Sequence, residues 1–278
     1  MKHNLLILLW ITLISNSPLQ LNEKAKSNNS EESQELWHDL ITPNLEESKI
    51  FYGDIFGWTF EDSNFKGTKM TTIINDGNVI GGMIEVKNAN TSTWICALPL
   101  STEALNQRIK SVLASGAKAV LPPVKIPGRG KQVVFEGPLG EEFSLISEND
   151  YTKKVTPKGV DKSWIGIELW ASNTSRGQEF YETAFGVSTT QISYDNKPYW
   201  VFKSGEKLVA GMINNPIKNQ GSQWVPYIKS TSINEQFLKL KNSKAAILLT
   251  PTEEVRKGNV GIIQDPHGAI IAIQNTKS

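Results

Sequence analysis

The sequence has little cysteine and little histidine. Cys96 is the only cysteine among 278 residues, and there are only three histidines. A single cysteine excludes an intramolecular disulfide and a cysteine-based zinc cluster within this chain. Because Cys96 lies in an apolar segment with the pattern of a strand, we expect it to be buried in the core.

The chain also lacks an excess of charge of either sign. Its 29 Lys and Arg and 28 Asp and Glu are dispersed and give a net charge of +1. No basic surface for nucleic acid or for an anionic membrane is therefore predicted. Three catalytic patterns are missing as well, namely Gly-x-Ser-x-Gly, His-Glu-x-x-His and a dinucleotide fingerprint after a strand. The expected partner is a small organic molecule.

Long hydrophobic runs are absent except near the N-terminus, where Leu5 to Ile14 follow Lys2 and His3. This run has the length of a signal-peptide core and is too short to span a bilayer comfortably. Residues 1–21 are predicted to be a signal peptide, or alternatively an uncleaved membrane anchor, and residues 22–34 a polar linker. The expected location is periplasmic or extracellular, with a membrane-anchored protein as the alternative.

The rest of the chain contains an internal sequence repeat. Trp37 to Leu40, Asn44, Phe51-Tyr52 and Phe56-Gly57 recur 129 residues later as Gly166 to Leu169, Asn173, Phe180-Tyr181 and Phe185-Gly186. Gly81-Gly82-Met83 recurs as Ala210-Gly211-Met212 at the same offset. A period of this length indicates duplication of a whole domain rather than a solenoid repeat.

Each copy shows a repeating order of strands and helices. In the first copy we predict a strand at 36–42, a helix capped by Asn44 and ended by Gly57, and strands at 69–75 and 79–86. A second cycle follows, with a strand at 93–100, a helix at 102–115, and strands near 117–121, 132–135 and 142–147. The pattern is two βαβββ modules per copy, four in the chain.

These motifs resemble the vicinal-oxygen-chelate superfamily, which includes glyoxalase I, bleomycin-resistance proteins and extradiol dioxygenases. The carrying segments are 37–44, 51–58, 121–128 and 137–140, together with their second copies. The resemblance implies an α+β fold of two tandem glyoxalase-like domains, each forming a curved half-open barrel from two βαβββ modules. We place domain 1 at 35–150, a linker at 151–162 and domain 2 at 163–278.

The resemblance also implies where a metal ion would be held. The corresponding positions in the first domain are Trp37, Glu85, Trp94 or Ile95, and Ser144; those in the second are Gly166, Asn214, Trp224 or Val225, and Ala272. Only Glu85 is a strong ligand among them. No cofactor is therefore predicted, and a divalent metal held by Glu85 and His38 is kept as the alternative.

Aromatic and acidic residues take the place of metal ligands. Alternation along a strand puts Trp37 and Asp39 on one face of the first domain, and Glu168 and Trp170 on the equivalent face of the second. Arg129 lies in a Pro- and Gly-containing loop that could bring it over the same face. Such a wall suits a flat or cationic organic ligand. The predicted ligand-binding set is Trp37, Asp39, Glu85, Trp94, Arg129, Glu168, Trp170 and Trp224.

Alternation directs His38 to the opposite face, so it is interpreted as structural, and His267 is interpreted as a solvated residue of the turn at 265–268. Three hypotheses for function follow. The first is an exported small-molecule-binding protein without a catalytic metal. The second is a metal-dependent glyoxalase-like lyase or isomerase, or a dioxygenase. The third is an interaction module in which both ligand sites are degenerate.

Overall fold

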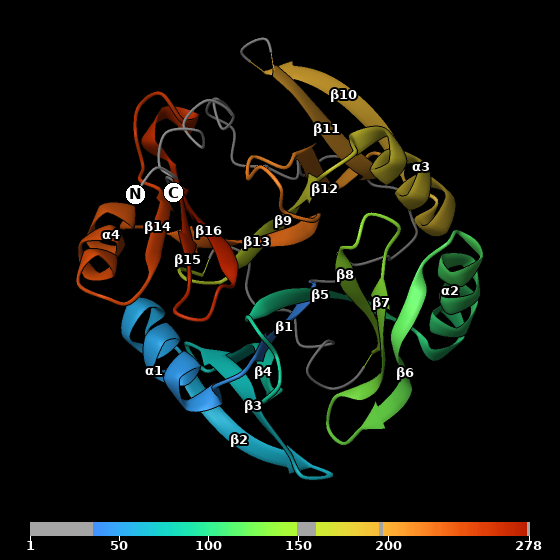
Figure 1. Cartoon of the computed structure of the whole chain (residues 1–278), viewed down its shortest axis with the longest axis horizontal. Coiled ribbons are helices and arrows are strands. Elements are labelled where there is room, and N and C mark those ends of the chain that lie inside the picture. The colour runs from blue at the N-terminus through green and yellow to red at the C-terminus, as the bar shows by residue number, and fades with distance from the viewer. Residues whose placement is uncertain (1–35, 149–159, 195–196, 277–278) are drawn as a thin grey trace.

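The computed structural model describes residues 36–148, 160–194 and 197–276, and contains two mixed sheets of eight strands each (Figure 1). The α+β class and the tandem arrangement expected from the sequence are confirmed. The first sheet and its helices comprise β1 (Trp37–Thr42), α1 (Leu45–Phe56), β2 (Thr59–Phe65), β3 (Thr68–Asn75), β4 (Asn78–Glu85), β5 (Thr93–Leu100), α2 (Thr102–Ala114), β6 (Lys118–Ile126), β7 (Gly130–Glu136) and β8 (Glu142–Ser147).

The second sheet repeats this order. It comprises β9 (Trp164–Ala171), α3 (Thr174–Phe185), β10 (Ser188–Tyr194), β11 (Lys197–Ser204), β12 (Lys207–Asn214), β13 (Gln223–Ser230), α4 (Ile233–Lys241), β14 (Ala246–Leu249), the short 3-10 helix η2 (Arg256–Gly258), β15 (Val260–Gln264) and β16 (Ile270–Asn275). The strand orders, β2-β3-β4-β1-β5-β8-β7-β6 and β10-β11-β12-β9-β13-β16-β15-β14, are identical in pattern. Each domain is therefore two modules joined through their first strands.

The first helix of each domain begins and ends in the same way. Asn44 and Asn173 accept hydrogen bonds from the backbone N–H groups of Glu47 (3.1 Å) and Arg176 (3.0 Å). Gly57 and Gly186 end the helices with φ of 71° and 69°, a left-handed conformation that favours glycine. The residues repeated between the two copies thus include those that begin and end the first helix of each domain.

The two domains share their cores. One cluster combines Leu40, Phe56 and Met83 of domain 1 with Phe237 and Ile271 of domain 2. A second cluster combines the other module of each domain. The helices are also paired between the domains, since α1 lies beside α4 and α2 beside α3 (Figure 1). Each helix layer is therefore completed by the other domain.

Buried tyrosines join the domains at two equivalent places. The Tyr52 hydroxyl of α1 donates to Asp265 Oδ2 (3.2 Å) and accepts from Trp94 Nε1 (3.0 Å). In the second copy the Tyr181 hydroxyl donates to Glu141 Oε1 (2.8 Å) and accepts from Trp224 Nε1 (2.9 Å). Each tyrosine thus links a tryptophan of its own domain to a carboxylate in a turn of the other domain.

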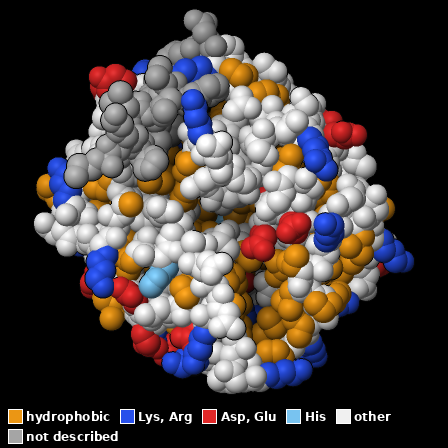
Figure 2. Space-filling model, viewed as in Figure 1, with side chains coloured by type: hydrophobic (Ala, Val, Ile, Leu, Met, Phe, Trp, Pro, Cys, Tyr) orange, Lys and Arg blue, Asp and Glu red, His pale blue; other side chains and the backbone are white. Residues whose placement is uncertain are grey.

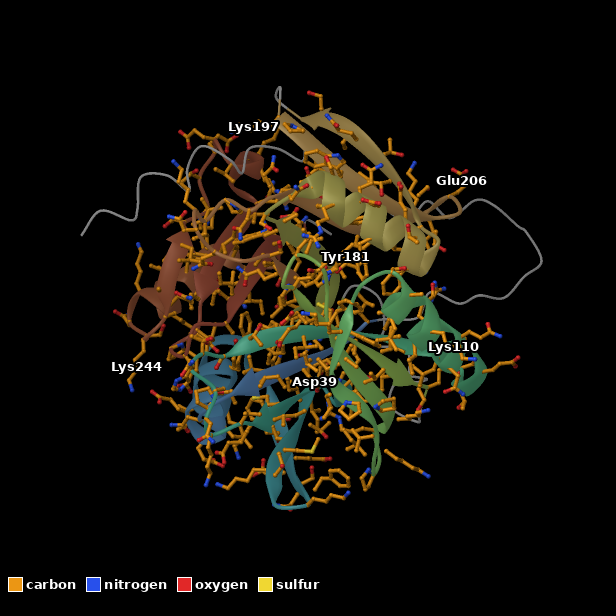
Figure 3. All side chains as sticks on the ribbon, turned by 45° about the vertical axis from the view of Figure 1, so that its right-hand side comes forward. Asp39, Lys110, Tyr181, Lys197, Glu206 and Lys244 are labelled. Carbon is orange, nitrogen blue, oxygen red and sulfur yellow. The ribbon has the colours of Figure 1, made fainter. Side chains whose placement is uncertain are left out.

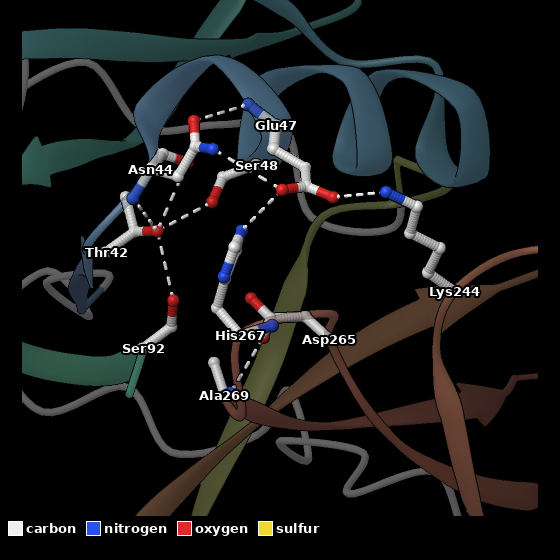
Figure 4. Close-up of polar contacts among 9 residues, drawn as sticks. All are labelled: Thr42, Asn44, Glu47, Ser48, Ser92, Lys244, Asp265, His267 and Ala269. Atoms are coloured by element: carbon white, nitrogen blue, oxygen red, sulfur yellow. Dashed lines mark hydrogen bonds and ion pairs between the residues drawn. The ribbon is translucent and has the colours of Figure 1, made fainter. Parts of the chain in front are cut away.

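A polar contact at the edge of the interface accompanies the first of these links. His267 Nε2 lies 3.2 Å from Glu47 Oε2, and Lys244 Nζ lies 2.7 Å from Glu47 Oε1 (Figure 4). Lys244 and His267 lower the pKa of Glu47, chiefly through the Lys244 hydrogen bond. His267 is therefore a contact between the domains, rather than the solvated turn residue expected from the sequence.

Hydrophobic side chains are also exposed on part of the surface. In Figure 2 they gather at the lower right, where Figure 1 places α2 and β6. Leu113, Val120 and Leu121 of these elements are exposed. No helix within the described residues has the length and hydropathy needed to cross a membrane. The predicted export signal and the 22–34 linker lie outside the described residues.

Candidate functional site

Each sheet has one face covered by helices and an opposite face, called here the inner face. Strand alternation separates the two faces clearly on β1. Leu40 belongs to the helix-side core, whereas Asp39 points to the other side, where a side chain on Gly82 would collide with it. Figure 3 shows Asp39 on the strands near the centre of the molecule.

The inner face of domain 1 centres on a buried ion pair. Asp39 Oδ1 accepts hydrogen bonds from Arg129 Nη2 and from Trp37 Nε1 (2.9 Å), and the Arg129 guanidinium lies over the Trp37 ring at 5.1 Å. A Cβ on Gly82 would lie 2.8 Å from both Arg129 Nη2 and Asp39 Oδ1, so this close approach requires glycine. Trp37, Asp39 and Arg129 form the domain 1 triad.

Domain 2 contains an equivalent triad of Glu168, Arg256 and Tyr227. Glu168 Oε2 accepts from Arg256 Nη2 (3.0 Å), and Glu168 Oε1 accepts from the Tyr227 hydroxyl (2.9 Å). The Arg256 guanidinium lies over the Tyr227 ring at 5.3 Å. Trp170 Nε1 donates a further hydrogen bond to Glu168 Oε1 (3.0 Å). Glu168 is the residue equivalent to Asp39, 129 positions later.

Both arginines are charged at neutral pH. Burial lowers the pKa of Arg129 to about 10, which still lies far above neutrality. Burial also opposes the charge on Arg256, but attraction from Tyr227 and Glu168 outweighs it and raises the pKa. Each triad therefore contains one arginine in contact with one carboxylate side chain.

A polar pair found only in domain 1 extends the first site. Gln132 Nε2 donates to Asp39 Oδ2 (3.0 Å) and to Ser144 Oγ (3.1 Å). Gln132 and Ser144 are both buried. The carbonyl oxygen Oε1 of Gln132 is buried without a hydrogen-bond partner. Sequence reasoning identified neither arginine–carboxylate pair and did not identify Gln132 as a site residue.

The other predicted ligand-binding residues are not all brought together. Trp37, Asp39 and Arg129 meet on the inner face of domain 1, and Glu168 and Trp170 on that of domain 2. Trp94 and Trp224 instead lie in the helix-side cores, hydrogen-bonded to tyrosines. Their neighbours Ile95 and Val225 pair with Asp39 and Glu168 on the inner faces.

Glu85 and His38 lie on the helix side and are far apart. Glu85 pairs with Thr42, whose hydroxyl contacts Ser48 of α1, and His38 contacts Trp164 in a tilted arrangement with ring centroids 4.3 Å apart. Gly81 is the partner of His38, and Glu85 is four residues further along β4, a separation of about 13 Å. Burial lowers the pKa of His38 to about 3, so its imidazole is neutral. These two residues cannot ligate the same metal ion.

Comparisons with known proteins agree with this architecture. No family model matches the sequence. The Mycobacterium bovis protein described as "Putative glyoxylase CFP32" is 20% identical over 244 residues, which cover 85% of this chain and 92% of CFP32. The 2,3-dioxygenase LapB from Pseudomonas sp. KL28 superimposes with a TM-score of 0.63 at 14% identity, covering 87% of this chain and 91% of LapB. The Mn(II)-bound glyoxalase from Novosphingobium aromaticivorans gives a TM-score of 0.60 at 14% identity, with 87% and 82% of the two chains covered.

The chain has the two-domain fold of the vicinal-oxygen-chelate superfamily and is related in sequence to CFP32. The resemblance to this superfamily implies a metal on the inner face, and the side chains present do not fit one. Within residues 36–148, 160–194 and 197–276, no three or more His, Cys, Asp or Glu side chains are grouped so as to hold a metal ion. Asp39 and Glu168 each accept three hydrogen bonds, one from an arginine. A divalent cation would have to displace that guanidinium, so no metal-dependent step is derived for this chain.

Proposed function

We propose that the chain is an exported protein that binds a small organic molecule on the inner face of domain 1, without a catalytic metal. The proposal is supported by the chemistry of the inner-face side chains and by the relationship to proteins named for small-molecule chemistry. Because Asp39 is already paired with Arg129, it does not offer a free negative charge. The expected ligand is therefore neutral rather than cationic.

The observation that carries the proposal is the unpartnered Gln132 carbonyl. Asp39 needs a donor from Gln132, which fixes the amide with its nitrogen toward the carboxylate and its oxygen away from it. A buried acceptor without a partner costs about 1–3 kcal/mol. A ligand that donates an N–H or O–H group to Gln132 Oε1 would recover much of this free energy.

Domain 2 lacks this acceptor. At the positions 128 residues after Gln132 and Ser144 it has Val260 and Ala272, which belong to a cluster of ten buried apolar residues on its inner face. The corresponding cluster in domain 1 contains three, Trp37, Ala97 and Ile146. Domain 2 therefore fills its inner face with its own side chains, and domain 1 is the better candidate for a ligand site.

Binding is tested with the full-length protein, because the shared cores would be cut open in separated domains. The probes are small aromatic hydroxyl compounds such as phenol and p-cresol, each paired with its methyl ether, and binding is followed by ligand-observed NMR. We expect the hydroxyl compounds to bind and their ethers to bind more weakly. Replacing Gln132→Val, the residue that domain 2 has here, should reduce affinity about tenfold, the scale of one hydrogen bond.

Gln107→Val makes the same change at an exposed position on α2 and is the matched control. The proposed site would be contradicted if the Gln132→Val and Gln107→Val variants bound the probes with equal affinity. It would also be contradicted if each hydroxyl compound and its methyl ether bound equally well. An absence of binding for every probe would favour the hypothesis of an interaction module. Mass spectrometry of the secreted protein, showing loss of roughly the first 21 residues, tests export separately.

The metal-dependent alternative retains one supporting observation, the name of the relative CFP32. It requires about one transition metal per chain in purified protein, held by residues other than the pair His38 and Glu85. It also requires glyoxylase activity that depends on this metal. Elemental analysis of the purified protein that finds no stoichiometric metal would remove this alternative.

A further inference from the structure

The two triads contain the same chemical groups supplied from different strands. In domain 1 the aromatic residue is Trp37 on β1, and the residue facing it across the sheet is Ala97 on β5. In domain 2 the equivalent pair is Gly166 on β9 and Tyr227 on β13. The large and small residues have exchanged places. In both domains the aromatic group still donates a hydrogen bond to the carboxylate and lies under the arginine.

Unusual backbone conformations bring both arginines to this position. Arg256 has a φ of 47°, in the left-handed region that a residue with a side chain rarely adopts, and Lys257 follows with a φ of 50°. In domain 1 the strain is taken by glycine, because Gly128 and Gly130 flank Arg129 with φ of 74° and 87°. Two segments of different backbone conformation therefore place a guanidinium at the equivalent position in each domain.

We infer that Arg129 and Arg256 are built-in cations that take the place of a metal ion on the two inner faces. Each guanidinium supplies a positive charge to a buried carboxylate on the first strand of its domain. The aromatic ring beneath it contributes a further attraction, since cations are stabilised over aromatic faces. Each carboxylate is thereby held by an arginine, and the first strand of each domain is joined to the β6–β7 loop or to η2 by an ion pair.

The inference does not depend on the ligand site, because it concerns domain 2 as much as domain 1 and its readout is stability. Removing only the guanidinium leaves a buried carboxylate without a compensating charge, which is far more harmful than removing both charges together. The single and double replacements therefore separate charge compensation from simple loss of packing.

The experiment measures Tm of the full-length protein with Arg129→Gln and with the double variant Asp39→Asn/Arg129→Gln. We expect the single variant to lose roughly 6–20 °C, or to fail to fold, and the double variant to recover most of this loss. Arg256→Gln and Glu168→Gln/Arg256→Gln should repeat the result in domain 2. Lys110→Gln on the exposed surface of α2, which removes one positive charge, should leave Tm nearly unchanged (Figure 3).

The wild-type Tm should be the same in EDTA and in millimolar MnCl2, because Asp39 and Glu168 are each held by an arginine. Two results would overturn the inference. One is a double variant that is no more stable than Arg129→Gln alone. The other is a rise in wild-type Tm with MnCl2 that disappears when Asp39 or Glu168 is replaced by its amide.

Discussion

Acid should destabilise this protein through His38, and His38→Phe should reduce that sensitivity. His38 is buried, lies against the Trp164 ring at a tilt, and has an Nδ1 atom without a hydrogen-bond partner. Burial lowers its pKa from 6.5 to about 3. The folded protein therefore keeps the imidazole neutral, whereas the unfolded chain takes up a proton below pH 6.5.

A lowered histidine pKa means that the unfolded state binds more protons, so stability is lost as the pH falls below 6.5 and down to about 3. The loss is about 1.4 kcal/mol for each pH unit, or roughly 2.7 kcal/mol at pH 4.5. Phenylalanine preserves a ring against Trp164 and removes the titrating group. It also removes the unpaired Nδ1, so the variant should be at least as stable as the wild type at pH 7.5.

The assay is urea unfolding of both proteins at pH 7.5, 5.5 and 4.5, with the difference in unfolding free energy taken at each pH. Buried carboxylates titrate in both proteins and cancel in this difference. Burial raises the pKa of Asp265 and of Glu141, so these two groups oppose acid unfolding equally in each. We expect the difference to grow in favour of His38→Phe by about 2–3 kcal/mol between pH 7.5 and 4.5. A difference that does not change with pH would refute the reasoning.

Two further replacements test the geometry of the inner face and of the domain interface. Gly82→Ala should place its Cβ against Asp39 and Arg129 and lower Tm by several degrees, on the order of 2 kcal/mol, whereas Gly67→Ala, in an open turn where φ alone is unfavourable, should cost less. An equal loss of Tm in the two variants would show that Asp39 and Arg129 can move aside for the added methyl group. Tyr181→Phe removes the hydroxyl that links Trp224 to Glu141, and should cost about 1–3 kcal/mol in urea unfolding because both partners stay buried. A loss below about 0.5 kcal/mol would show that this link does not hold the domains together.

Local patterns in the sequence predict the fold well because they are repeated. The two capping asparagines and the two helix-ending glycines define the first helices in both copies, and the structure places the caps at these residues. Alternation along β1 separates His38 from Asp39, and the structure shows the same separation. Helix caps and strand alternation depend on neighbouring residues, so they can be recognised without knowing how the rest of the chain folds.

Two features could not be recognised by hydrophobic pattern. β2 was not assigned from the sequence because its residues are exposed or half-buried, so it lacks an apolar alternation. Trp94 was expected near the ligand, yet it lies on the helix side. Its strand is apolar on both faces, so alternation gives no direction there.

The ion pairs are the least predictable part of the site. Arg129 is 90 residues from Asp39 in sequence, and Arg256 is 88 residues from Glu168. The sequence places Arg129 on a loop near the inner face but does not show which partner it finds there. Aligning the copies at an offset of 127 residues would have matched Arg129 with Arg256. That match is the one signal that could have revealed the second triad.

X-ray diffraction from crystals of the full-length protein soaked in MnCl2, recorded near the manganese absorption edge, tests the central claim most directly. The account predicts Arg129 in contact with Asp39, Arg256 in contact with Glu168, and no anomalous peak on either inner face. A manganese peak bonded to Asp39 or Glu168, with the arginine displaced, would contradict it.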